Sequence, residues 1–338
     1  MKTAIGCLLG LLLVSGVPTA RAAEDLAGTT AGSFLTLGAG AGVPAMGGAA
    51  LAIGGNLAAA TWNPASLGML DETEIALSHV TLADPARQEW LAMGGRLGAL
   101  PTRWALTGVY HGEGSFEGRD ASNNPTGSFE ASSMAFGLQL AQRFGSRVSL
   151  GLGGKYVGEK LGDVTGAGIT MDAGLQLHAG AFGIGVAGQN LGGAMKYDET
   201  RYDFPTNVGV GLSWDDTRSG VRVALDANFP SSYYNDVRAG AEWRWKEAFA
   251  VRAGYRKELG APADEGLSGP SFGAGAGMRG MWLDYGYVVP GSGEGQHRLA
   301  ITFRPARYAM DDPFDPKNMR RDFDAPPLIG PPVPEKHR

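Results

Sequence analysis

The chain has 338 residues, of which 54 are glycine and 19% are charged, and its formal net charge at pH 7 is -5. The negative charge argues against nucleic acid as a partner, and the composition suits neither a disordered chain nor a helical membrane protein. Beyond residue 22, no segment has the roughly 18 uninterrupted apolar residues of a transmembrane helix, so any membrane insertion must use strands.

Residues 1–22 have the features of a signal peptide. Lys2 supplies a positive start, residues 8–17 form an apolar stretch, and Ala20-Arg21-Ala22 is a cleavage site with small residues at both ends. We therefore expect the protein to leave the cytoplasm. Cys7 is the only cysteine. A lipoprotein cleavage before Cys7 would leave no usable signal, so we do not expect lipid attachment there. Removal of the signal peptide also removes Cys7, and the mature chain then has no disulfide and no thiol nucleophile.

The segment 23–73 is rich in glycine and alanine and shows no strand pattern, but it is too apolar for a free linker. Its large apolar side chains include Phe34, Leu35, Leu37, Met46, Leu51 and Trp62. It contains a turn-forming word, Trp62-Asn63-Pro64-Ala65. We predict an N-terminal hatch or plug that folds back inside or at the lumen of the domain that follows. A flap on the surface of that domain is the alternative.

Residues 74–303 alternate between apolar and polar or very small residues with a period of two, which sends successive side chains to opposite faces of a sheet. Such runs number about fourteen, and most have the roughly ten residues with which a tilted strand crosses hydrocarbon. They lie near 74–81, 87–97, 102–111, 130–142, 146–158, 168–178, 181–190, 205–214, 219–229, 235–245, 248–257, 271–279, 281–289 and 296–303. The pattern predicts an all-β, transmembrane antiparallel β-barrel of about 14 strands.

The connections between these runs give a second indication. Every other connection is short, whereas those between them include the longer segments 111–129, 191–204 and 258–270. Outer-membrane barrels have tight periplasmic turns and longer outer loops, so we expect a bacterial outer-membrane protein with both termini periplasmic. A soluble β-sandwich or propeller also alternates, but it has no reason to sort its loops in this way.

The face opposite the apolar one carries many glycines and charges of both signs, and its small residues leave space for an open channel or for the hatch. Eight charged residues on this face could form a ladder in the lumen: Arg222, Asp226, Arg238, Glu242, Arg244, Arg252, Asp284 and Arg298. Because unpaired charge in a narrow lumen is costly, we expect them to pair with one another or to tether the hatch. The alternative is a filter for the solute.

Residues 304–338 are rich in proline and charge and poor in large apolar side chains. We expect a largely disordered periplasmic tail. Its plainest role is a soluble end of the chain, and the alternative is a strap that docks a periplasmic partner.

No motif indicates an enzyme. Gly183-Ile184-Gly185-Val186-Ala187-Gly188 matches a dinucleotide-binding pattern by letters, but it lies within a predicted strand and no helix follows it. The chain has no Gly-x-Ser-x-Gly elbow, no His-Glu-x-x-His zinc motif and no Ser-His pair that would support an acyl hydrolase. The five histidines are scattered. We therefore expect no catalytic residues, no cofactor and no metal.

Several sequence words point to a family. In the predicted hatch they are Gly32-Ser33-Phe34-Leu35-Thr36-Leu37-Gly38, Ala45-Met46-Gly47-Gly48-Ala49 and Ala60-Thr61-Trp62-Asn63-Pro64-Ala65-Ser66-Leu67. In the predicted barrel they are Met171-Asp172-Ala173-Gly174-Leu175, Gly188-Gln189-Asn190-Leu191-Gly192, Phe204-Pro205-Thr206, Gly240-Ala241-Glu242, Val251-Arg252-Ala253-Gly254-Tyr255, Leu283-Asp284-Tyr285-Gly286 and His297-Arg298. In this order, the words resemble the PorV/PorQ family, which is related to the FadL-type fatty-acid transporters.

The resemblance implies a barrel of about fourteen strands whose N-terminus occupies the lumen. It also implies a hatch signature formed by Met46, Gly47, Gly48, Trp62, Asn63 and Pro64. We expect a non-enzymatic outer-membrane barrel of the transport class, with FadL-like passage of small apolar or amphipathic solutes. Its partners would be outer-membrane lipid and a hydrophobic solute. The alternative is a PorV-like secretion, assembly or surface-anchoring component that binds secretion or periplasmic proteins through its loops and residues 304–338.

Overall fold

The computed structural model describes residues 30–306, except 84, 247, 263–265 and 292–293. The predicted signal peptide lies outside the described residues, as does the predicted tail beyond residue 306. The predicted hatch is described from residue 30, and residues 30–73 are called the N-terminal segment below.

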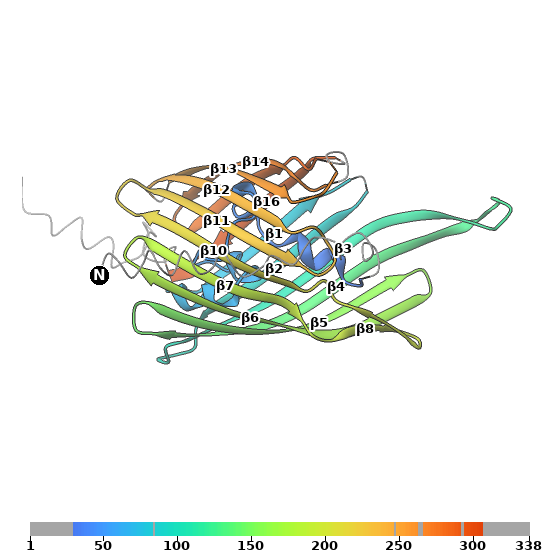
Figure 1. Cartoon of the computed structure of the whole chain (residues 1–338), viewed down its shortest axis with the longest axis horizontal. Coiled ribbons are helices and arrows are strands. Elements are labelled where there is room, and N and C mark those ends of the chain that lie inside the picture. Colours follow the sequence, from blue (N-terminus) through green and yellow to red (C-terminus); the bar gives the residue numbers. More distant parts are fainter. Residues whose placement is uncertain (1–29, 84, 247, 263–265, 292–293, 307–338) are drawn as a thin grey trace, which may run out of the picture.

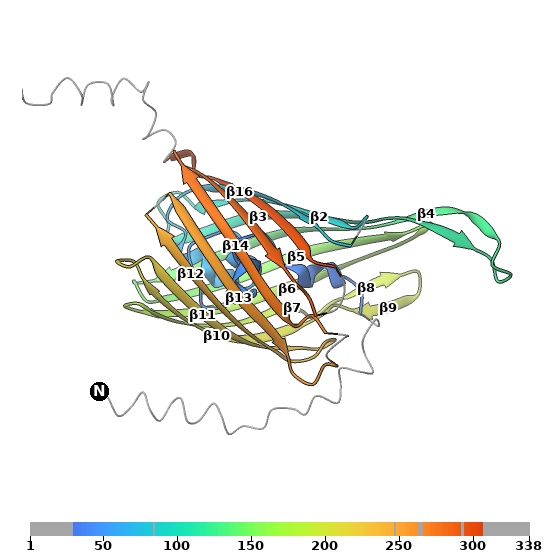
Figure 2. The same ribbon diagram turned by 90° about the horizontal axis from the view of Figure 1, so that it is seen from above.

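Within the described residues, fourteen antiparallel strands form a closed barrel (Figures 1 and 2). Their bounds are β1 (Glu74–Thr81), β2 (Arg87–Arg96), β3 (Thr102–Arg119), β4 (Pro125–Phe144), β5 (Val148–Leu161), β6 (Val164–Ala179), β7 (Phe182–Leu191), β10 (Asn207–Asp216), β11 (Val221–Pro230), β12 (Asp236–Trp245), β13 (Phe249–Glu258), β14 (Gly269–Met278), β15 (Met281–Val288) and β16 (Gln296–Phe303). Neighbouring strands of this set pair in chain order, and the pairing of β16 with β1 closes the circle. The predicted all-β barrel is confirmed.

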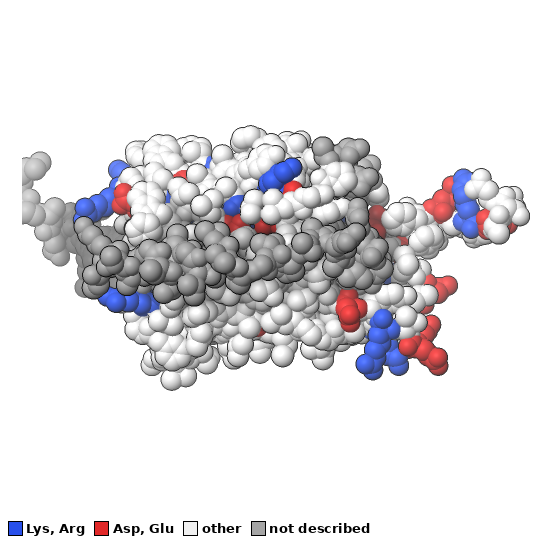
Figure 3. All heavy atoms as spheres, viewed as in Figure 1, with Lys and Arg blue, Asp and Glu red and all other residues white. Residues whose placement is uncertain are grey.

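The strands are two-faced, as the alternation predicts. In β12, Glu242 is buried in the lumen while Trp243 and Trp245 are exposed on the outer wall. The outer wall carries many other exposed apolar side chains, for example Leu152 and Phe182. In Figure 3, most of the described atoms on one side are uncharged, and charged side chains lie near its two ends, on the projecting hairpin and at a few places near its middle. An apolar outer wall whose strand edges are all paired meets the requirements of lipid, so the barrel spans a membrane.

The two ends of the barrel differ. β3 and β4 continue through residues expected to form the loop 111–129, and their hairpin projects far beyond the wall (Figure 1). A second hairpin, β8 (Ala194–Tyr197) and β9 (Thr200–Asp203), lies within the predicted loop 191–204. The sequence does not predict these extensions because residues 112–129 are rich in glycine, serine and asparagine, which are depleted in strands or neutral to them.

We call the end with these hairpins the long-loop end. At the opposite, short-turn end, the strands are joined by turns such as 145–147 and 279–280. Strand β1 begins and β16 ends there.

The N-terminal segment lies inside the barrel (Figure 2). It forms four short 3-10 helices, η2 (Ser33–Leu37), η3 (Pro44–Met46), η4 (Ala59–Thr61) and η5 (Pro64–Met69). Leu57 and Leu67 pack with Trp90 of the wall, and Leu51 packs with Ala187. Within the described part of the chain, no helix is both long and apolar enough to cross a membrane.

Candidate functional site

The Met46-Gly47-Gly48 motif packs against two glycines of the barrel wall. Gly240 and Gly254 are directly opposite each other in β12 and β13, and a Cβ atom on either would overlap the backbone of residues 46 and 47. Gly47 and Gly48 have φ angles of 70° and 78°, in the left-handed region that glycine tolerates. Glycine is therefore required on both sides of this contact.

The Trp62-Asn63-Pro64 motif packs against a second pair of wall glycines, Gly151 and Gly174. Asn63 is fully buried; its Nδ2 donates to the carbonyl of Leu51 at 2.7 Å, and its Oδ1 accepts the amide of Ala65 at 3.0 Å. A Cβ atom at Gly174 would overlap the Asn63 side chain, and one at Gly151 would overlap the backbone of Pro64. The amide side chain thus links two parts of the N-terminal segment while it fits against a bare stretch of wall.

Many glycines of the lumen face therefore mark close contact with the N-terminal segment rather than an open channel. The word 183–188, which matches a nucleotide-binding pattern by letters, lies in β7. A Cβ atom at Gly185 would overlap the Leu51 carbonyl, and one at Gly183 would lie 3.1 Å from the Ala52 carbonyl. In this structure, these two glycines accommodate a backbone from the same chain.

Asp226 is a predicted lumen charge that contacts the N-terminal segment directly. Its Oδ2 accepts the backbone amides of Ala50 and Leu51 at 2.7 and 3.0 Å, and all three residues are buried. Arg238 is directly opposite Asp226 in the sheet, yet it pairs with Asp236 at 2.7 Å instead. The carboxylate of Asp226 therefore anchors the segment.

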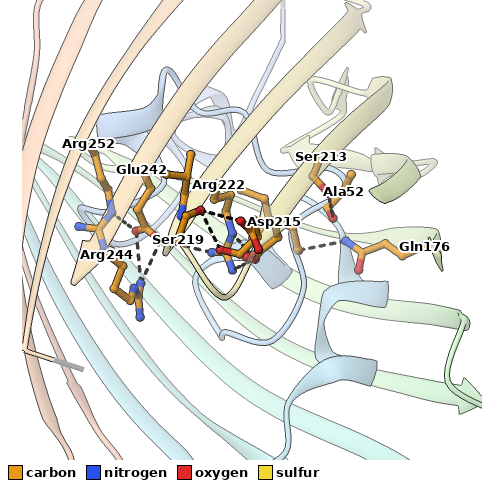
Figure 4. Close-up of polar contacts among 12 residues, drawn as sticks. Ala52, Gln176, Ser213, Asp215, Ser219, Arg222, Glu242, Arg244 and Arg252 are labelled. Carbon is orange, nitrogen blue, oxygen red and sulfur yellow. Dashed lines mark hydrogen bonds and ion pairs between the residues drawn. The ribbon is translucent and has the colours of Figure 1, made fainter. Parts of the chain in front are cut away.

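Five other predicted charges form a cluster at the short-turn end, and Figure 4 labels four of them: Arg222, Glu242, Arg244 and Arg252. Glu242 lies at its centre, with Arg252 at 2.5 Å, Arg244 at 3.2 Å and Arg222 at 3.6 Å. Arg252 also pairs with Asp284, at 2.6 Å. Arg222 also pairs with Asp215, so three arginines face three carboxylates and the cluster is neutral overall.

A further group lies at the long-loop end. There Asp236 pairs with Arg238 and, at 2.9 Å, with Arg256. Arg298 is different: it is buried and has no ion pair among the described residues. Its Nη2 donates to the carbonyl of Leu37 in the N-terminal segment at 3.1 Å. Of the eight predicted charges, five thus belong to the short-turn cluster and Arg238 to the long-loop group, while Asp226 and Arg298 contact the segment. They do not form one continuous ladder.

Neutral polar side chains that the sequence did not single out also hold the N-terminal segment. Gln176 Nε2 donates to the carbonyls of Leu51 and Ile53 at 2.9 and 3.0 Å, and Ser213 Oγ donates to the Ala52 carbonyl at 3.0 Å (Figure 4). Other neutral wall side chains that donate to carbonyls of the segment are Gln88, Gln139, Ser149 and Gln189. The charged side chain of Arg103 donates to the Leu70 carbonyl. Inward glutamine and serine occur on many strands, so no sequence signal marks these positions.

Among the described residues, small cavities lie in the lumen on both sides of the N-terminal segment. The cavity at the short-turn end measures about 80 Å³ and is lined in part by Met46, Glu242 and Arg252. The cavity at the long-loop end measures about 50 Å³ and is lined in part by Trp62 and Arg238. A dry cavity that holds benzene measures about 150 Å³. Neither space would hold a solute of that size while the segment is in place.

Among the residues that the structure describes, no group of three or more His, Cys, Asp and Glu is placed to hold a metal ion.

The fold is similar to that of solved transporter barrels. The P. putida toluene transporter TodX matches with 14% identity and a TM-score of 0.59, over 79% of this chain and 98% of that chain. The monoaromatic hydrocarbon channel CymD matches with 15% identity and a TM-score of 0.56, over 79% and 97%. No protein-family model and no curated protein sequence matches the chain. At such low identity the likeness establishes the fold alone.

Proposed function

We propose that this protein is an outer-membrane transport barrel that passes small apolar or amphipathic solutes, with the N-terminal segment as its hatch. The likeness to TodX and CymD, whose descriptions name toluene and monoaromatic hydrocarbons, supports this class of solute. The position of β1 and β16 at the short-turn end supports periplasmic termini, because periplasmic turns are the short ones in such barrels.

The observation that carries the proposal is the way the N-terminal segment is held. Side chains from several strands bind its backbone individually, and each such hydrogen bond contributes only about 1 kcal/mol, or about 1.5–3 kcal/mol where the partner is charged. Water or solute can replace these contacts one at a time. The two lumen cavities beside the segment, of about 50 and 80 Å³, are each too small for such a solute. This supports passage that requires the segment to move.

The paired charges fit a role in keeping the wall rigid while the segment moves. Glu242, Arg252 and Asp284 bind one another across β12, β13 and β15, and their ion pairs do not involve the segment. Asp226 and Arg298 bind the segment itself. The first set supports the barrel, and the second set supports the closed position of the hatch.

The test is uptake of radiolabelled toluene by Gram-negative cells that express the chain. Expression should raise the initial uptake rate above that of cells with an empty vector, and it should leave uptake of a hydrophilic sugar unchanged. Equal toluene uptake in the two strains, with the folded barrel present in the outer membrane, would exclude the proposed function.

A PorV-like role in secretion or surface anchoring is the second candidate. Two observations favour it: the family words lie at the contacts between segment and wall, and the β3–β4 hairpin projects far from the barrel, as a docking element would (Figure 1). Under this role, removal of residues 304–338 should abolish co-purification of a periplasmic partner. A full chain that co-purifies with no protein from native membranes would count against this role.

A further inference from the structure

Among the described residues, three buried arginines lie in the lumen, and one of them has no counter-ion. Arg103 lies 3.6 Å from Asp71, and Arg252 pairs with Asp284 at 2.6 Å. Arg298 is 2% exposed, and no carboxylate in the described part of the chain lies within 4 Å of its guanidinium. Its Nε and Nη1 atoms are buried and have no hydrogen-bond partner there either. The guanidinium therefore keeps an uncompensated charge and unused donors.

The hydrogen bond from Arg298 to the N-terminal segment does not require a charge. Arg298 Nη2 donates to the Leu37 carbonyl at 3.1 Å. On the same register row, two strands away, the neutral amide of Gln88 donates to the next carbonyl, that of Gly38, at 3.0 Å. Burying an unpaired guanidinium costs stability, and an ionisable side chain in a membrane-spanning element indicates a functional site. The charge of Arg298 therefore has a role beyond holding the segment.

Arg298 lies where an entering solute would meet it. It is the third residue of β16, which begins at the long-loop end, and the segment in place is bound to it through Leu37. Movement of the segment withdraws that carbonyl and leaves the guanidinium facing the opened lumen. Asp226 would lose its partners too, but Arg238 is directly opposite it in the sheet, whereas the residues directly opposite Arg298 are uncharged. The opened passage then has an excess positive charge at the level of Arg298.

We infer that Arg298 makes the passage charge-selective: it binds the carboxylate of an aromatic acid and repels an aromatic ammonium ion. A guanidinium offers a planar fork of N–H donors that matches a carboxylate with two parallel hydrogen bonds. Basic side chains that line a pore favour anions for the same electrostatic reason. The inference rests on the proposed function and narrows its amphipathic solutes to anions. A neutral aromatic solute has no charge to interact with Arg298, so its passage does not depend on this residue.

Uptake of three labelled solutes of similar size tests the inference: toluene, benzoate and benzylamine, of which the last two are ionised with opposite sign at pH 7. Cells that lack general porins and express the full chain should take up benzoate faster than benzylamine, after subtraction of the empty-vector rate. Arg298→Gln removes the charge and keeps a donor of the kind by which Gln88 holds its carbonyl. It should lower benzoate uptake roughly tenfold relative to toluene, the difference between a charge-assisted and a neutral hydrogen bond, and it should raise benzylamine uptake.

Two further variants separate the charge in the lumen from other effects. Arg298→Lys keeps the positive charge, so benzoate should still be taken up faster than benzylamine. Arg87→Gln removes the same net charge from an exposed position on the outer face of β2 and leaves the lumen unchanged. Uptake of all three solutes by this variant should equal that by the unmodified chain.

Three results would overturn the inference while toluene is still taken up. The first is equal uptake of benzoate and benzylamine by the unmodified chain, a comparison that needs no variant to fold. The second is an unchanged ratio of the two in a folded Arg298→Gln barrel, and the third is an equal fall of that ratio in Arg87→Gln. Absence of toluene uptake by the unmodified chain would instead exclude the proposed function, and this inference with it.

Discussion

Asp226→Ala is expected to loosen the N-terminal segment while the barrel stays folded. The carboxylate accepts two buried amides, from Ala50 and Leu51, at 2.7 and 3.0 Å. Hydrogen bonds to a charged group contribute about 1.5–3 kcal/mol each, so the loss is at least about 3 kcal/mol. Since 1.36 kcal/mol corresponds to a factor of ten, local opening of the segment should become roughly 150-fold more frequent.

Hydrogen–deuterium exchange of peptides that contain residues 50 and 51 measures this opening. Exchange in Asp226→Ala should be faster by about that factor, with the same heat-dependent gel mobility as the unmodified chain. Asp215→Ala is the control, because Asp215 pairs with Arg222 and makes no hydrogen bond to the N-terminal segment in the described residues. Unchanged exchange at residues 50 and 51 in a folded Asp226→Ala barrel would refute the anchoring role of this carboxylate.

Other substitutions separate the contacts with the segment from those within the wall. Gly185→Ala places a methyl group against the Leu51 carbonyl and should lower stability by about 1–3 kcal/mol, whereas Gly154→Ala meets open space and should leave the unfolding midpoint in urea unchanged. Arg252→Met leaves Glu242 and Asp284 without their main partner and should destabilise the barrel by about 3–5 kcal/mol. Arg298→Met removes the hydrogen bond to the Leu37 carbonyl but also a buried cation that has no ion pair among the described residues, so thermal unfolding should show a smaller loss of stability than in Arg252→Met. A loss as large as that of Arg252→Met would contradict this account of the lumen charges.

The strands of the barrel could be predicted closely because alternation is a local signal. The predicted run 219–229, where Val223 and Leu225 oppose Arg222 and Asp226, agrees with β11 (Val221–Pro230) to within two residues at either end. The β3–β4 extension could not be predicted, because a hairpin that projects into water needs no apolar face and leaves no alternation in the sequence.

The contacts of the N-terminal segment were harder to predict for a different reason. Its backbone groups, rather than its side chains, bind the wall, and no pattern in the sequence pairs a carbonyl of residue 51 with Gln176 or an amide with Asp226. The charge pairs depend on sheet register as well: Glu242 and Arg252 are directly opposite and do bind, whereas Asp226 and Arg238 are directly opposite and do not.

A disulfide between the N-terminal segment and the wall tests the hatch most directly. A Cβ atom at Gly286 would lie 3.5 Å from the Cβ of Ala45, within the range that a disulfide spans. It would also lie 2.7 Å from the Ala41 carbonyl, so Gly286→Cys alone is the control for that displacement. Cells that express the oxidised Ala45→Cys/Gly286→Cys variant should take up toluene no faster than cells with an empty vector. Reduction of the disulfide should restore the faster uptake. Toluene uptake that is equally fast in the oxidised and reduced states, with the bond verified by mass spectrometry, would contradict a hatch that must move.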